Sequence, residues 1–255
     1  MKLISWNVNG IRSCTEKGFL EWFRQEQPDI LCVQETKAWP EQLSEELTAP
    51  DGYTTYWASA EKKGYSGVAT FARRAPKSTE VGLGVADLDG HGRTLIHDFG
   101  DFILFNCYFP NSQDDLNRLP LKLAYDQEIL NRCEAFKAQG RNVIVCGDFN
   151  VAHQPIDIKN AKANEGKSGF TAEERAWMTE FLSLGYIDAF RHMHPDEPDH
   201  YTWWSFRTAA RKRNVGWRID YFVISPELAP NLKRSWHLPD VLGSDHCPVG
   251  IEIHL

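Results

Sequence analysis

The sequence predicts an α/β fold, because short apolar runs of β type alternate with helical stretches along the whole chain. The runs are four or five residues long and rich in β-branched and aromatic side chains, which favours strands. The strands expected from them are Leu3–Trp6, Ile30–Val33, Val68–Phe71, Phe102–Phe105, Val143–Cys146, Tyr221–Ile224 and Val249–Ile253. No low-complexity tract or linker divides the chain, so residues 1–255 are expected to form a single domain.

Helical stretches between these runs place apolar residues on one face. They are Thr15–Glu26, Leu121–Gln139 and Thr171–Leu184. The last has the clearest ends, since Thr171 and Glu174 fit a capping box and Gly185 suits the left-handed position that follows a helix. The first strands alternate with a helix, whereas the middle of the chain brings strands close together. This pattern is compatible with one mixed sheet or with two sheets.

The formal net charge of −7 argues against a protein that holds nucleic acid through overall positive charge. A site built of carboxylates can nevertheless make the net charge negative while local basic clusters face an anionic partner. The densest such cluster is Arg207, Arg211, Lys212 and Arg213. Charge runs usually form solvated faces, but the aromatic residues beside this one favour contact with phosphates.

The six cysteines predict a reducing environment, because none of them forms a C-x-x-C pair and several lie in apolar runs. The chain shows neither the pattern of a signal peptide nor an apolar stretch of 18 residues. We therefore expect a cytoplasmic protein that is not inserted into a membrane.

Polar residues that are suited to catalysis or ligand binding flank several of the apolar runs. They are Asn7, Glu35, Asp148, Asn150, Asp220, Asp245 and His246. Catalytic and ligand-binding groups of α/β proteins gather beyond the strand ends at one edge of the sheet, so these side chains are candidates for one site. Hard oxygen ligands suit Mg²⁺ or Mn²⁺ rather than zinc. Such a set can neutralise phosphoryl charge, activate water and stabilise a leaving oxygen, which are the needs of phosphodiester hydrolysis.

Each of these residues taken alone has a simpler interpretation as a solvated turn residue or a helix cap. Asn9 and Gly10 form a strong turn signal, so the asparagines near them can serve the turn. The run Ser244-Asp245-His246 is not expected to be a serine triad, because adjacent residues rarely point into one site and no G-x-S-x-G elbow is present.

Seven blocks of the sequence resemble the exonuclease III family of AP endonucleases, and they follow the family's order over nearly the whole chain. They are Ser5–Arg12, Gln34–Lys37, Gly64–Val68, Tyr108–Asn111, Gly147–His153, Val215–Tyr221 and Gly243–Pro248. The resemblance implies a DNase I-like, four-layer sandwich of two packed mixed β-sheets flanked by helices. It also implies a Mg²⁺-dependent hydrolase, with Mn²⁺ able to substitute, that cuts duplex DNA 5′ to abasic sites and trims 3′ ends secondarily. A monomer without an obligate protein partner is expected.

The resemblance further implies roles for individual residues. Glu35 is the principal metal ligand, and the other residues expected at the metal are Asn7, Asp148, Asn150 and Asp245. Asp148 is the acid/base group beside the attacking water, and Asn150 bonds the phosphate or the nucleophile. His246 contacts the scissile phosphate and is oriented by Asp245. Tyr108 and Asn111 lie beside the phosphate, and Asp220 supports catalysis.

Contacts with DNA are implied for a second set of residues. Tyr65, Arg93 and Arg207 are expected near the DNA backbone. Trp203, Phe206 and Trp217 are expected to wall a pocket for the base-less deoxyribose, although a tryptophan is more often a plain core residue.

Two departures from the family pattern affect these expectations. Asn9 stands where some relatives carry an aspartate ligand, which puts a second metal position in doubt. The loop of residues 112–115 is acidic where some relatives place an arginine against DNA. The alternatives are a member in which exonuclease activity dominates, a phosphodiesterase acting on lipid or inositol phosphates, and a silent nucleic-acid-binding regulator. The presence of Glu35, Asp148 and His246 argues against the last.

Overall fold

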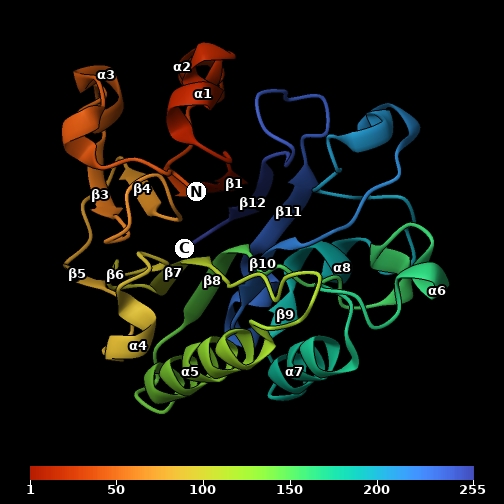
Figure 1. Cartoon of the computed structure of the whole chain (residues 1–255). Coiled ribbons are helices and arrows are strands. Elements are labelled where there is room, and N and C mark those ends of the chain that lie inside the picture. The colour runs from red at the N-terminus through yellow and green to blue at the C-terminus, as the bar shows by residue number, and fades with distance from the viewer.

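Two six-stranded mixed sheets form the centre of the molecule (Figure 1). The computed structural model describes residues 1–255, except for the side chain of Thr208. The first sheet has the order β11-β12-β1-β2-β4-β3, and the second has the order β5-β6-β7-β8-β10-β9. The strands of the first sheet are β1 (Lys2–Asn7), β2 (Ile30–Gln34), β3 (Thr54–Ala58), β4 (Val68–Ala72), β11 (Leu232–His237) and β12 (Val249–Ile253). Those of the second are β5 (Ser78–Val81), β6 (Thr94–Asp98), β7 (Ile103–Tyr108), β8 (Val143–Asp148), β9 (Ile187–Asp188) and β10 (Asp220–Ile224).

Helices cover the outer faces of both sheets, which completes the four layers that the resemblance implied (Figure 1). The α-helices are α1 (Ile11–Glu16), α2 (Phe19–Glu26), α3 (Glu45–Thr48), α4 (Ala86–Asp89), α5 (Leu119–Lys137), α6 (Ala161–Asn164), α7 (Ala172–Ser183) and α8 (Ala189–Met193). Short 3-10 helices occur at Pro40–Gln42, Pro155–Asp157, Arg207–Ala209, Arg211–Arg213 and Pro226–Asn231. Among the helices that the structure describes, none combines the length and apolarity needed to cross a bilayer.

The two sheets repeat one arrangement of strands. β1 and β2 are parallel neighbours in the first sheet, and β7 and β8 are parallel neighbours in the second. Each parallel pair is flanked by antiparallel strands. Since parallel strands end at the same edge, each sheet presents two carboxyl-terminal strand ends side by side.

The inner faces of the sheets share one apolar core, with Leu3 and Ile251 from the first sheet against Leu104, Ile144 and Phe222 from the second. Buried polar contacts cross this core at Asn106 of β7. The Gln34 amide donates to Asn106 Oδ1 at 2.8 Å, and Asn106 Nδ2 donates to the Ala69 carbonyl at 2.8 Å. A buried amide pair of this kind has few alternative partners, so it helps to fix how the sheets lie against each other.

All seven strands expected from the sequence form, but five others lack an apolar run of their own. β5 is a largely exposed edge strand with the sequence STEV, and β11 has exposed charged residues at its centre. Edge strands commonly carry such polar residues, which hides them from a search for apolar runs.

The helix predicted over Thr15–Glu26 is wrong as a single element. The chain forms α1 and then α2, and Gly18 between them has a φ of 101°. A left-handed residue cannot continue a right-handed helix, so the backbone changes direction there. The predicted capping box of α7 is confirmed, with Thr171 accepting from the Glu174 amide and Gly185 at a φ of 98°.

Gly147 in β8 should be the least replaceable glycine beside the site. Its φ is +138°, and a Cβ there would lie 1.8 Å from the carbonyl oxygen of Cys107 in β7. We expect Gly147→Ala to lower the free energy of unfolding by more than about 3 kcal/mol, because neither backbone can move aside within the ladder. Urea denaturation measures this loss.

Gly140→Ala is the matched control. Gly140 also has a positive φ, +71°, but nothing lies within 4 Å of its added Cβ. Backbone strain alone should cost about 1–2 kcal/mol there. Equal losses in the two variants would contradict the steric argument.

Candidate active site

The carboxyl-terminal ends of the two parallel strand pairs meet across one cavity. Asn7 ends β1, Glu35 follows β2, Tyr108 ends β7 and Asp148 ends β8. The cavity has a volume of about 440 Å³, and the other predicted residues on its lining are Asn111, Asn150, Trp203, Trp217, Asp245 and His246. The strand topology therefore brings together side chains that are far apart in sequence.

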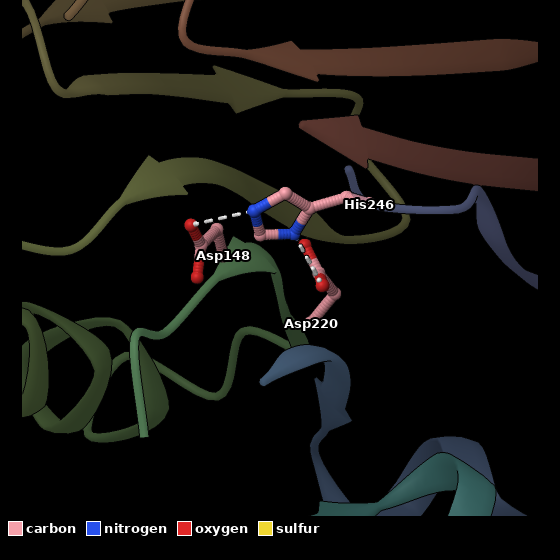
Figure 2. Close-up of side chains that lie close together, drawn as sticks. All are labelled: Asp148, Asp220 and His246. Atoms are coloured by element: carbon pink, nitrogen blue, oxygen red, sulfur yellow. Dashed lines mark hydrogen bonds and ion pairs between the residues drawn. The ribbon is translucent and has the colours of Figure 1, made fainter. Parts of the chain in front are cut away.

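His246 lies between two buried carboxylates (Figure 2). Its Nδ1 is 2.9 Å from Asp220 Oδ2, and its Nε2 is 3.8 Å from Asp148 Oδ2. Burial lowers the pKa of the imidazole, but the charges of Asp220 and Asp148 outweigh that effect and raise the pKa to about 10. At neutral pH the ring is a cation that donates to Asp220 and turns its second N–H toward Asp148.

Asp148 is the most strongly shifted carboxylate of this cavity. Burial raises its pKa to about 7, and Asp220 adds to the rise, while His246 opposes it. Asn7 Nδ2 donates to Asp148 Oδ2 at 2.9 Å, and the amide nitrogen of Asn150 donates to the same oxygen at 3.1 Å. A carboxylate with a pKa near neutrality can both accept and release a proton under physiological conditions.

Asp220, rather than Asp245, orients His246. The prediction that Asp245 would do so is wrong, because its carboxylate oxygens accept instead from Asn9 Nδ2 at 2.9 Å and from Trp203 Nε1 at 3.0 Å. Asp220 is itself held by Thr202, whose hydroxyl donates to Oδ2 at 2.6 Å. The sequence carried no signal for Thr202, since its contact with Asp220 arises only from the tertiary fold.

Glu35 faces the cavity from a strained backbone position. Its φ is +52°, and its neighbours Asn9 and Lys37 also have positive φ. The Tyr108 hydroxyl donates to Glu35 Oε1, and Lys37 Nζ lies 3.6 Å from Oε2. Burial, reinforced by the Glu35 charge, raises the pKa of Tyr108 well above its usual value, so the phenol remains a donor.

The donors around Glu35 fit a hard divalent cation. Glu35, Asn7 and Asp245 all line the cavity and carry side-chain oxygen atoms, and oxygen ligands suit such ions. Asp148, Asp220 and His246 also lie close enough together to hold a metal ion. However, the imidazole there is a cation held between two carboxylates, so this trio is better suited to acid–base work than to coordination.

Two tryptophans wall the cavity. Trp203 and Trp217 exchange backbone hydrogen bonds of 2.9 Å, and their rings meet edge to face at 5.9 Å. The structure does not place Phe206 with them. Phe206 is 70% exposed and lies in a separate cavity with Leu242, because the chain leaves the Trp203–Trp217 pairing and turns outward before the 3-10 helix Arg207–Ala209.

The arginines predicted to contact DNA differ in how accessible their side chains are. Arg93 is only 3% exposed and donates to Tyr65 Oη and to the Tyr108 carbonyl. It therefore has a structural role and holds Tyr65 and Tyr108 in place. Arg207 is exposed. Arg211 donates to the carbonyls of Pro239, Val241 and Ser244, which makes it chiefly structural and corrects its interpretation as a phosphate contact.

Several cavity residues were not predicted from the sequence. Asp114, Lys167, Ser168, Gly169 and Ile219 also line it. Ser168 and Gly169 lie in the segment between α6 and α7, for which the residue pattern gave no sign of proximity to the strand ends.

An acid–base trio beside a cavity lined with carboxylate and amide oxygens is suited to the hydrolysis of phosphate esters. The family model for the endonuclease/exonuclease/phosphatase family matches residues 4–246, and the chain belongs to that family. The prediction of an enzyme that hydrolyses phosphodiester bonds is thereby confirmed.

Individual relatives agree with this assignment. The chain is 44% identical to an exodeoxyribonuclease of Bacillus subtilis, with both chains covered in full. It is 43% identical to the DNA repair nuclease APEX1 of Danio rerio, over 98% of this chain and 81% of that protein. An AP endonuclease from Archaeoglobus fulgidus has a similar structure, with a TM-score of 0.90, 27% identity and full coverage of both chains.

Replacement of Asp220 should show how His246 acquires its charge. Asp220→Asn removes the carboxylate on Nδ1, so the pKa of His246 should fall from about 10 toward or below the value of a free histidine. An NMR titration of the imidazole measures the shift. Asp245→Asn is the control, since its carboxylate does not bond the ring, and an equal fall in both variants would contradict the assignment.

Proposed function

We propose that this protein cuts the phosphodiester bond 5′ to abasic sites in duplex DNA, with trimming of 3′ ends as a secondary activity. The observation that carries the proposal is one cavity in which Asp148 and His246 face Glu35 beside the paired rings of Trp203 and Trp217. The first three residues supply the chemistry of hydrolysis, and the tryptophans supply a reason to select a sugar without a base.

In this proposal, Asp148 takes a proton from the attacking water. Its pKa of about 7 allows this near neutral pH, and the amides of Asn7 and Asn150 hold its oxygens in place. The new O–P bond forms as the P–O3′ bond breaks. The His246 cation, held by Asp220, donates to a phosphoryl oxygen as negative charge builds there. Asn111 lines the same cavity, and its amide has a second N–H that can orient the phosphate. Tyr108 can donate to the phosphate only when its hydroxyl leaves Glu35 Oε1.

Mg²⁺ is the proposed cofactor, with Mn²⁺ able to substitute. Glu35 would be the principal ligand, and the other proposed ligands on the lining of the cavity are Asn7, Asp148, Asn150 and Asp245. When bound, the ion supplies positive charge that offsets the charge on phosphoryl and leaving oxygens.

The tryptophan walls favour an abasic site for two physical reasons. An abasic deoxyribose has no base to unstack, so its extrusion from the helix costs little. An intact nucleotide must be unstacked at a cost of a few kcal/mol and would then meet the rings of Trp203 and Trp217. Tyr65 and the exposed Arg207 are the proposed contacts to the DNA backbone, whereas the buried Arg93 can act only by holding Tyr65 in place. Phe206 could reach DNA only outside the pocket.

We also infer that residues 1–255 act as one catalytic unit and as a monomer, because both sheets of a single chain contribute the proposed catalytic groups. The six cysteines are all free and buried, which fits a reducing compartment such as the cytoplasm.

A 5′-labelled duplex with one central tetrahydrofuran residue tests the proposal. We expect a single product cut at the 5′ side of that residue in Mg²⁺, and none after exhaustive EDTA treatment, because the cation charge is then lost. Cleavage that persists in EDTA would contradict the metal requirement.

Two variants assign roles in the same assay. Glu35→Gln should weaken Mg²⁺ binding more than DNA binding, so that cleavage needs a higher Mg²⁺ concentration. Asp148→Asn should lower the turnover rate by at least about 10²-fold and leave DNA affinity unchanged or higher, since a general base and a negative charge are lost together.

Trp203→Ala should change substrate choice. Removal of one wall enlarges the pocket, so degradation of undamaged 3′ ends should rise relative to abasic cleavage. The measurement is the ratio of the two rates, with Trp236→Ala, on β11 and outside the cavity, as the control. If wild-type protein degrades undamaged ends as fast as it cuts the abasic duplex, exonuclease activity dominates instead.

A further inference from the structure

Glu174 makes more hydrogen bonds than its place in a helix cap requires. It is fully buried at the third position of α7. Its Oε2 accepts from the backbone nitrogen and the hydroxyl of Thr171, at 3.1 Å and 2.9 Å. The same oxygen accepts from the Gly169 nitrogen at 2.9 Å, and Oε1 accepts from the Ser112 hydroxyl at 2.7 Å. A capping box explains the contacts with Thr171, but not those with Gly169 and Ser112.

The bond to Ser112 joins Glu174 to the segment that carries Asn111. A carboxylate only accepts, so the Ser112 hydroxyl must donate to it. Ser112 Oγ is then available to accept from Ser168 Oγ, 2.7 Å away. Ser168 and Asn111 both line the catalytic cavity. Glu174 thus fixes the position of the Ser112 and Ser168 hydroxyl groups and the direction in which each donates its hydrogen bond.

A second chain of bonds continues from Asn111 to the proposed base. Asn111 Oδ1 accepts from the Gln113 nitrogen at 2.8 Å, which turns its amide nitrogen toward Asn150 Oδ1 at 2.9 Å. Asn150 in turn donates from its amide nitrogen to Asp148 Oδ2 at 3.1 Å. Because each amide is already oriented, the donors all point toward Asp148.

The bond to Gly169 acts on the part of the cavity that Trp217 lines. A Cβ on Gly169 would lie 3.1 Å from the ring of Trp217 and 3.3 Å from the Asn150 carbonyl, so its backbone packs tightly on both. Its carbonyl accepts from the Ala152 nitrogen at 2.9 Å. Displacement of Gly169 would therefore move the tryptophan wall and the loop that carries Asn150 together.

We propose that Glu174 is a positioning residue for catalysis, which sets the Asn111–Asn150–Asp148 hydrogen-bond chain and the Trp217 wall through its bonds to Ser112 and Gly169. This inference rests on the proposed function, since the group it positions is the proposed base. Glu174 touches neither substrate nor metal, and its effect should appear in turnover rather than in binding.

The test compares Ser112→Ala and Glu174→Gln with Thr171→Ala. Ser112→Ala removes the link to Asn111 and leaves the helix cap intact. Thr171→Ala weakens the same cap but keeps the bonds from Gly169 and Ser112 to Glu174, so it is the matched control. Abasic cleavage in Mg²⁺ gives kcat and KM, and thermal unfolding gives the stability of each variant.

Ser112→Ala and Glu174→Gln should lower kcat at least about tenfold with KM within about twofold, as expected of small misplacements at a reacting centre. Thr171→Ala should lose stability and keep kcat. The proposal is overturned if Ser112→Ala retains wild-type kcat, or if kcat falls in step with stability in all three variants.

A measurement independent of activity separates this inference from the proposed function. The side-chain amide NMR signals of Asn150 and Asn111 should shift in Ser112→Ala but not in Thr171→Ala. Unchanged signals in Ser112→Ala would overturn the inference even if wild-type protein cuts abasic DNA. A wild-type protein that fails to cut abasic DNA while the signals shift would overturn only the function.

Discussion

The parallel pairing of two strands within each sheet is the constraint on which the rest of the structure depends. β1 with β2 and β7 with β8 each end at one edge, and the packing of the sheets brings these four ends together. Neither sheet contains a complete site, since Asn7 and Glu35 belong to the first and Tyr108 and Asp148 to the second. The Gln34–Asn106 contact between the sheets therefore supports the geometry of the chemistry as well as the core.

Several residues at the site have backbone conformations that are energetically unfavourable. Asn9, Glu35, Lys37 and Asn150 all have φ between 47° and 52°. Left-handed conformations of residues other than glycine cost free energy and persist only where the surroundings enforce them. Backbone bonds do so here, as Gly10 donates to the Glu35 carbonyl at 2.7 Å and Lys37 donates to the Ser66 carbonyl at 2.8 Å. Such positions turn the ends of strands sharply, so that Glu35 and Asn150 face the cavity.

Local sequence could predict the central strands other than β6, because most buried strands have continuous apolar runs, whereas β6 has the sequence TLIHD. It could also predict the strand-end residues, because the polar residue after each run is visible. It could not predict which groups pair. The choice of Asp220 over Asp245 as the partner of His246 depends on β10 lying beside β8, with Asp220 opposite Asp148. The error at Phe206 has the same origin, since Trp203 and Phe206 are near in sequence but only Trp203 is paired to Trp217. Gly18 did carry a local signal for the break between α1 and α2, which the apolar periodicity obscured.

The position of β12 has a consequence for biosynthesis. This strand lies between β11 and β1, so the first strand of the fold is paired on one side by its last strand. His246 and Asp245 belong to the loop just before β12. A nascent chain consequently has Glu35 and Asp148 long before it has the histidine that completes the trio. The segment that runs from His246 into β12 thus completes both the first sheet and the trio.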